Sequence, residues 1–185
     1  LIGWWPLNER DGQIAKDLSG NGFEGILGNS TSGDIAEPSQ GVAGIGGSTS
    51  YKFNGSLSQA KYIRVNNSGI KRNYEEFSMF TWFKADRWQE STSYARILSF
   101  DAANRDVSGD RALIFYDTDD KVYGFTSSNS NPATYDYRKD LGVGSLPTQE
   151  WILMGGTLNG THAEIYKNGE KIGQYKTNDT LDLEN

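Results

Sequence analysis

Apolar side chains recur at every second position along much of the chain, and no stretch shows the 3.6-residue period of an amphipathic helix. Turn sequences such as Asn168-Gly169 and Thr118-Asp119-Asp120 separate the alternating segments. The glycine- and serine-rich stretch 28–47 has little periodicity and is expected to be a loop. The pattern predicts one all-β, antiparallel, two-sheet sandwich domain, with strands at 2–7, 23–27, 50–53, 62–65, 77–84, 96–101, 112–117, 122–126, 151–158, 162–167 and 171–175.

The segment FSMFTWFKA, residues 77–85, predicts which side chains of a central strand face the core. Successive side chains of a strand point to opposite faces. One face would carry Phe77, Met79, Thr81 and Phe83, and the other Ser78, Phe80, Trp82 and Lys84. The first set is the expected core. Because the second places two large aromatic rings on a face that should be polar, we expect a loop of the same chain, a ligand or a partner chain to cover it.

Composition narrows the class of partner. The 185 residues carry a net charge of −6 and no clustered basic surface, which argues against binding nucleic acid. No apolar run reaches the length of a membrane span. Cysteine is absent, which excludes disulfides and thiolate metal sites. The chain begins at Leu1, so we expect a processed product, a trimmed chain or part of a longer protein.

Five N-x-[ST] sequons occur, at Asn29, Asn54, Asn66, Asn159 and Asn178. Their number favours an exported, glycosylated protein. The alternative is that asparagine, serine and threonine are simply common in turns.

The stretch DLSGNGFEG, residues 17–25, has two interpretations. Asp17 and Asn21 either shape a turn or supply oxygen ligands to a cation, with glycines that let backbone carbonyls face inward.

Four segments in order resemble the laminin-G-like, concanavalin-A-like lectin/glucanase jelly-roll family. They are IGWWPLNERDG with DLSGNGFEG, then YKFNGSLSQAKYIRVNN, FSMFTWFKAD and WILMGGTLNGTHAEIYKNGEKIG. The resemblance covers about residues 2–173. It implies secreted or surface-displayed, non-enzymatic modules that bind glycans or cell-surface proteins, often with a structural calcium ion. It further implies Asp17 and Asn21 as calcium ligands, with carbonyls near Gly20 and Gly22.

The family's last strands follow the Tyr-x-Asn-Gly hairpin, and the chain stops at TNDTLDLEN before them. We therefore expect either that these strands were removed or disordered, or that another chain, including a neighbouring copy, completes the sheet edge. This departure also bears on calcium, since the last strand often adds an acidic ligand.

Catalysis by paired carboxylates is not predicted, although glycoside hydrolases share this fold. Glu75 and Glu76 are adjacent and would face opposite sides, Glu164 is the only acid on its strand, and Glu170 lies beyond the hairpin. A remnant of such an enzyme is the least favoured interpretation. His162 is the only histidine, and a surface or turn position is expected for it.

Two further loops are candidates for ligand recognition. Residues 101–110 contain several side-chain oxygens and Arg105, and are read as a solvated loop or a binding loop at the rim. The segment NPATYDYRKD adds aromatic and basic side chains that bind ligands or pack inward. The expected ligand-binding set is Phe80, Trp82, Lys84, Trp88, Tyr94, Arg105, Tyr135, Tyr137 and Arg138. The rival function is a structural subunit of a surface filament, appendage or capsid.

Overall fold

The computed structural model describes residues 1–54, 59–66, 73–74, 76–87, 94–101, 111–117, 122–128, 147–159, 162–176 and 181–182. The fold is all-β, with 47% strand and 3% helix, and the strand pairs are antiparallel, as the alternating pattern predicts. The chain forms two compact units, Leu1–Ile70 and Lys71–Asn185, which are described separately below. Whether they make one domain stays a prediction.

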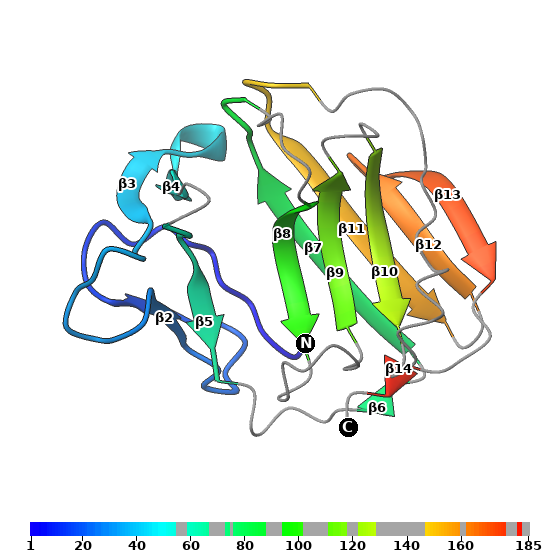
Figure 1. The fold of residues 1–185 in the computed structure, drawn as a ribbon, viewed down its shortest axis with the longest axis horizontal. Helices are drawn as coiled ribbons and strands as arrows, with labels where there is room; N and C mark the ends of the chain where they lie inside the picture. Colours follow the sequence, from blue (N-terminus) through cyan, green and yellow to red (C-terminus); the bar gives the residue numbers. More distant parts are fainter. Residues whose placement is uncertain are drawn as a thin grey trace. The chain divides into compact units, whose positions relative to one another are not determined.

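The first unit is built from two small sheets (Figure 1). Strands β1 (Ile14–Ala15), β2 (Gly25–Leu27) and β5 (Ile63–Val65) pair in the order β1-β2-β5. Strands β3 (Ser39–Ala43) and β4 (Thr49–Lys52) pair around the short 3₁₀ turn η1 (Ile45–Gly47). The core consists of Ala15, Leu27 and Tyr51, against which Trp5, Leu7 and Ile63 pack.

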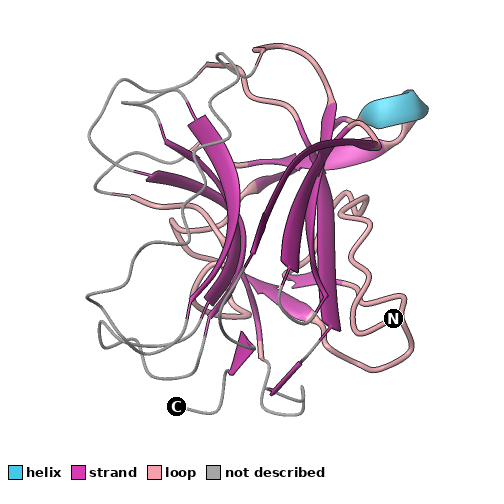
Figure 2. Cartoon of the chain, turned by 90° about the vertical axis from the view of Figure 1, so that its right-hand side faces the viewer, coloured by secondary structure: helices cyan, strands magenta, loops and turns pink. Residues whose placement is uncertain are grey.

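The second unit contains two larger sheets. One has the order β13-β12-β11-β7, formed by β7 (Glu76–Phe83), β11 (Ile152–Asn159), β12 (His162–Lys167) and β13 (Glu170–Lys176). The other has the order β10-β9-β8, formed by β8 (Tyr94–Asp101), β9 (Arg111–Asp117) and β10 (Val122–Ser128). Strand β9 contacts β11 and β10 contacts β12, so the two sheets face each other (Figure 1). A short ladder joins β6 (Asn73–Tyr74) to β14 (Leu181–Asp182), and Figure 2 gives the side view.

The buried side of the four-stranded sheet explains why its sequence alternates. Met79, Ile152, Met154, Leu158 and Ile165 are buried, and each lies at the same parity as its cross-strand neighbours. A fully buried aliphatic side chain of this size contributes roughly 1.5–3 kcal/mol relative to exposure. The predicted inward and outward faces of residues 77–84 are confirmed, since Met79 is buried, Phe77, Thr81 and Phe83 are partly buried, and Ser78, Phe80, Trp82 and Lys84 are exposed.

The hairpin predicted at Asn168-Gly169 is confirmed. Asn168 and Gly169 have φ of 51° and 85°, the left-handed values that a type I′ turn requires at both central positions. The Asn168 backbone N–H donates to the Leu153 carbonyl at 2.8 Å, and Leu153 N–H donates to the Asn168 side-chain oxygen at 2.9 Å. The turn is thereby fixed to β11 as well as to its own strands.

Two expectations are wrong in the first unit. No strand forms over residues 2–7, because Pro6 lacks an N–H and Leu7 has a φ of 54°. Instead, the backbone of Trp4 bonds to the turn at Asp17 and Leu18. Residues 28–47 are not a plain loop, since they contain β3 and η1. The glycines and serines of this stretch concealed the pairing of β3 with β4.

Candidate functional site

The outer face of the four-stranded sheet carries the aromatic side chains that the sequence places there. This outer face is defined by the exposed side chains of β7 and the residues across from them on β11, β12 and β13. Phe80 is 46% exposed and Trp82 is 47% exposed. The Lys84 ammonium lies 5.6 Å from the centre of the Trp151 ring, which is cation–π distance. Among the described residues of the second unit, Phe80 and Trp82 are the exposed large hydrophobic side chains.

A glycine on the neighbouring strand leaves the space that the Phe80 ring occupies. Gly155 is the cross-strand partner of Phe80, and a Cβ added to it would lie 1.9 Å from Phe80 Cδ1. The ring therefore lies flat over the β11 backbone. On its other side the Tyr166 ring centre is 6.0 Å away, at an interplanar angle of 51°. This arrangement fixes Phe80 and Tyr166 as one aromatic shelf across three strands.

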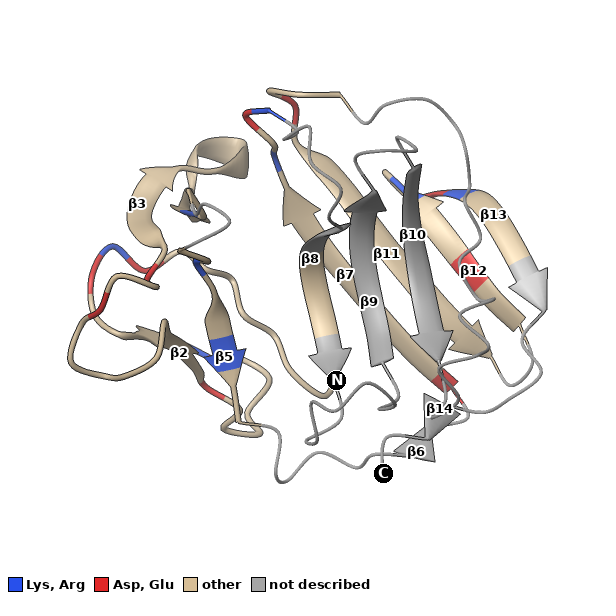
Figure 3. Cartoon of the chain, in the orientation of Figure 1, with Lys and Arg blue, Asp and Glu red and all other residues tan. Residues whose placement is uncertain are grey.

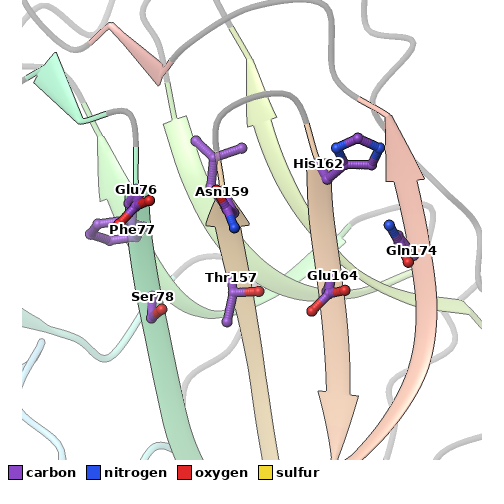
Figure 4. Close-up of a pocket in the computed structure, with 9 residues that line it drawn as sticks. Glu76, Phe77, Ser78, Thr157, Asn159, His162, Glu164 and Gln174 are labelled. Atoms are coloured by element: carbon purple, nitrogen blue, oxygen red, sulfur yellow. The ribbon is translucent and has the colours of Figure 1, made fainter.

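A polar groove of about 890 Å³ opens on the same sheet (Figure 4). It lies beside the shelf, because its lining residue Ser78 is two positions from Phe80 on β7. Strand register aligns one row of its side chains across all four strands: Ser78, Thr157, Glu164 and Gln174. Glu76, Asn159 and His162 form the next row at the end of the sheet. The groove is thus lined by hydroxyls, carboxylates, amides and one imidazole, together with the apolar Phe77 and Leu158. The pairing of β7 with β11 joins the lining residues of β7 to those of the consecutive strands β11, β12 and β13.

Glu164 lines the groove and is held there by two neighbouring side chains. The Tyr166 hydroxyl donates to Glu164 Oε2, and Lys171 Nζ donates to Oε1 at 3.0 Å. The hydrogen bond from Tyr166 and then that from Lys171 keep the pKa of the Glu164 carboxyl below its usual value. The same bond to Glu164 raises the pKa of the Tyr166 hydroxyl. Glu164 therefore stays an ionised acceptor at neutral pH.

The turn at residues 17–23 belongs to the first unit and is a hub of hydrogen bonds. Asp17 Oδ1 accepts from the backbone N–H of Trp4 and Ser19, both at 2.9 Å. Oδ2 accepts from the Ser19 hydroxyl at 2.7 Å and the Phe23 N–H at 3.0 Å. Burial alone would raise the pKa of Asp17, but these bonds lower it to about 2. The carboxylate thereby connects the amino-terminal segment to the turn.

The donor set around Asp17 fits a hydrogen-bonded turn better than a calcium site. A carboxylate offers about four acceptor positions, and four donors occupy those of Asp17. The Asn21 amide nitrogen donates to the carbonyls of Leu1 and Ile2, both at 2.9 Å. Gly20 and Gly22 have positive φ, as either interpretation requires. No group of three or more histidine, cysteine or acidic side chains able to hold a metal occurs in the described part of the chain. Calcium at this turn stays a prediction.

Several predicted site residues are not placed by the structure. Trp88, Arg105, Tyr135, Tyr137 and Arg138 lie outside the described residues, and so does the side chain of Tyr94, whose backbone is in β8. Of the sequons, Asn178 lies outside them as well. Asn29, Asn54, Asn66 and Asn159 are exposed, and Asn159 lines the groove. The Asn29 side-chain oxygen accepts from the Tyr62 hydroxyl. Glycosylation stays a prediction for all of them.

The polar groove was missed by sequence reasoning, and so was the presence of Glu76 and Glu164 in one groove. Each is the only groove carboxylate on its strand, and only the pairing β7-β11-β12 brings them to one groove. The signal that could have found them is the alternation itself, which puts Glu76 and Ser78 on the face of Phe80. It could not give the strand order.

Acidic and basic side chains are interspersed along the described chain (Figure 3).

Two facing antiparallel sheets make the second unit a β-sandwich, as expected for the jelly-roll class. A family model described as the concanavalin A-like lectin/glucanases superfamily matches residues 54–185, and the chain belongs to that family. Neither the comparison with curated proteins nor that with solved structures found a match. Laminin G-like domains are typically non-catalytic and often extracellular. Among the described residues, no helix has the length and apolar character needed to cross a membrane.

Proposed function

We propose that the chain is a non-enzymatic, extracellular recognition module whose outer face binds a glycan or a protein. The observation that carries this proposal is the pair of half-exposed rings, Phe80 and Trp82, on one face of the four-stranded sheet. Adjacent large aromatics exposed on a sheet face typically mark a binding surface, because burying them on contact with a ligand is favourable.

The way in which the Phe80 ring is held supports a role of this face in recognition. Phe80 is fixed between Gly155 and Tyr166, so little side-chain entropy remains to be lost when a ligand covers it. Polar side chains of the groove lie beside the aromatic residues, and known interfaces likewise combine an apolar centre with polar side chains at its edge. The proposal does not depend on calcium, since the Asp17 turn belongs to the other unit.

The test compares two equally exposed aromatic residues. Trp82→Ala should weaken binding about tenfold or more, because truncating a central aromatic anchor costs on the order of 2 kcal/mol. Phe53→Ala is the matched control, since Phe53 is 48% exposed but lies in the first unit. Binding is measured on a glycan array and on an array of extracellular proteins. Unchanged binding by Trp82→Ala, with the circular dichroism of the folded protein, would rule out this face.

A further inference from the structure

We propose that the polar groove beside the aromatic shelf binds a neutral saccharide, with Glu164 as a fixed acceptor for its hydroxyl groups. This inference rests on the proposed function and narrows its ligand. It assigns roles to Ser78, Thr157, Gln174 and Glu164, which lie in one row across the four strands.

The groove and the shelf are placed to contact one extended ligand. Their rows are adjacent on the same face, since Ser78 and Phe80 are two positions apart on β7. Two residues of a strand span about 7 Å, so the polar row and the aromatic row are separated by about that distance. A chain of sugar rings lying along β7 would therefore place one ring over Phe80 and Tyr166 and the next in the groove.

The lining suits a ligand that both donates and accepts hydrogen bonds at many points. The hydroxyls of Ser78 and Thr157 can do either, and the amides of Asn159 and Gln174 offer both a donor and an acceptor. The sugar hydroxyl group has the same dual character. The Phe80 ring complements this with an apolar face for the C–H face of a sugar ring, and the Tyr166 ring lies beside it at an angle of 51°.

Glu164 is pre-organised for the acceptor role. Tyr166 holds one carboxylate oxygen and Lys171 the other, and Lys171 also donates to the Gln174 side-chain oxygen at 3.2 Å. Each carboxylate oxygen keeps a further acceptor position. Because the side chain is already fixed, binding costs little conformational entropy, and hydrogen bonds to an ionised acceptor are stronger than those to a neutral one.

The charge of the groove selects against acidic glycans. Glu76 and Glu164 both line it, and the ammonium of Lys171 is engaged with Glu164 at 3.0 Å. The whole chain also carries a net charge of −6. Sulfated or uronic acid-containing chains would meet like charges here, whereas a neutral saccharide would not.

The experiment is a glycan array carrying neutral, amine-bearing, sulfated and uronic acid-containing chains. Protein is produced in a host that does not glycosylate asparagine, so that Asn159 leaves the groove open. Glu164→Gln and Thr157→Val should each weaken binding to neutral chains about tenfold, because each removes a polar contact. Glu170→Gln is the matched control, with the same chemical change on the same sheet but outside the groove. Since Glu164 and Lys171 form a surface pair, Glu164→Gln should leave folding unchanged.

The outcomes separate this inference from the proposed function. Neutral-chain binding that is lost in Trp82→Ala but retained in Glu164→Gln and Thr157→Val would overturn the groove and leave the recognition module standing. Binding confined to sulfated or uronic chains would overturn the neutral ligand in the same way. If no glycan on the array is bound, the saccharide proposal is wrong, and the array of extracellular proteins then tests whether the chain is a recognition module. Release of new reducing ends, lost in Glu164→Gln, would instead overturn the non-enzymatic role.

The sequon at Asn159 supplies a second readout. A glycan on Asn159 would occupy the groove, so protein from a glycosylating host should bind the neutral chains at least about tenfold more weakly than its Thr161→Ala variant, which keeps Asn159 but loses the sequon. Mass spectrometry of the tryptic peptide confirms the glycan. Equal binding by the two proteins, with Asn159 shown to be modified, would contradict a ligand in the groove.

Discussion

At the scale of single residues, the Asp17 carboxylate helps to hold an amino-terminal segment that forms no strand. The sequence suggests a first strand at residues 2–7, but Pro6 and the positive φ of Leu7 prevent it. The segment is held instead by the Asp17 carboxylate, which accepts the Trp4 N–H, and by Asn21, which donates to the Leu1 and Ile2 carbonyls. Hydrogen bonds to side chains thus hold this segment, in place of the backbone hydrogen bonds between paired strands.

Asp17→Asn tests whether this turn needs a metal. We expect a lower Tm, and the same decrease in calcium and in EDTA, because the replacement keeps the shape but replaces one accepting oxygen with a donor facing N–H groups. The measurement is thermal unfolding by circular dichroism in both buffers. A decrease seen only in calcium would mean that the turn holds the ion.

Because the pKa of Asp17 is low, we expect the stability of the fold to depend on pH in the acid range. The pKa is lower in the folded state, about 2, than the ordinary 3.8, so ionised Asp17 stabilises the fold above pH 4 and this contribution is lost as pH falls from about 4 to 2. Wild type should therefore lose Tm over that interval more steeply than Asp17→Asn. Parallel curves for the two proteins would show that Asp17 is not the titrating group.

At the scale of elements, the outer face depends on the pairing of β7 with β11. The pairing sets Phe80 against Gly155, where a side chain would collide with the ring, and sets Ser78 against Thr157 in the groove row. A slip of one residue in this register would turn the aromatic rings to the interior. The polar row and the shelf are therefore both consequences of one register.

Gly155→Ala should destabilise the second unit by about 1–3 kcal/mol, because the added Cβ must displace the Phe80 ring. The measurement is unfolding in urea. The double variant with Phe80→Ala should recover part of the loss, since the colliding ring is then absent. A single variant as stable as wild type would show that Phe80 does not lie over Gly155.

At the scale of the whole molecule, the edges of the four-stranded sheet bear on whether copies of the chain associate. Among the described strands, β7 has a neighbour only on its β11 side and β13 only on its β12 side. Edges of this kind can recruit another chain, which is what a structural subunit would require. A recognition module would instead remain monomeric although these strand edges are unpaired.

Light scattering over a concentration series, with calcium and then with EDTA, distinguishes the two. We expect a monomer whose molar mass, 20.5 kDa for the chain alone, does not change with concentration. Growth into oligomers or fibres would instead favour a subunit whose sheet is completed by its neighbours.

The alternation of Phe77–Lys84 was enough to assign the faces of β7, and Asn168-Gly169 was enough to place a hairpin, because both depend on local geometry. The same local rules set most strand bounds in the second unit to within two residues. They failed at β3, where glycine and serine hide the period, and at residues 2–7, where distant side chains decide the backbone.

The sequence by itself therefore determined the all-β class, the outward aromatic rings and the family. Only the tertiary structure decided that Glu76, Ser78, Thr157 and Glu164 share a groove, and that Glu164 is held by Tyr166 and Lys171. The physical reason is that alternation is a property of one strand, whereas a row across a sheet depends on strand order and register. Long-range hydrophobic packing fixes order and register, and no single strand encodes either.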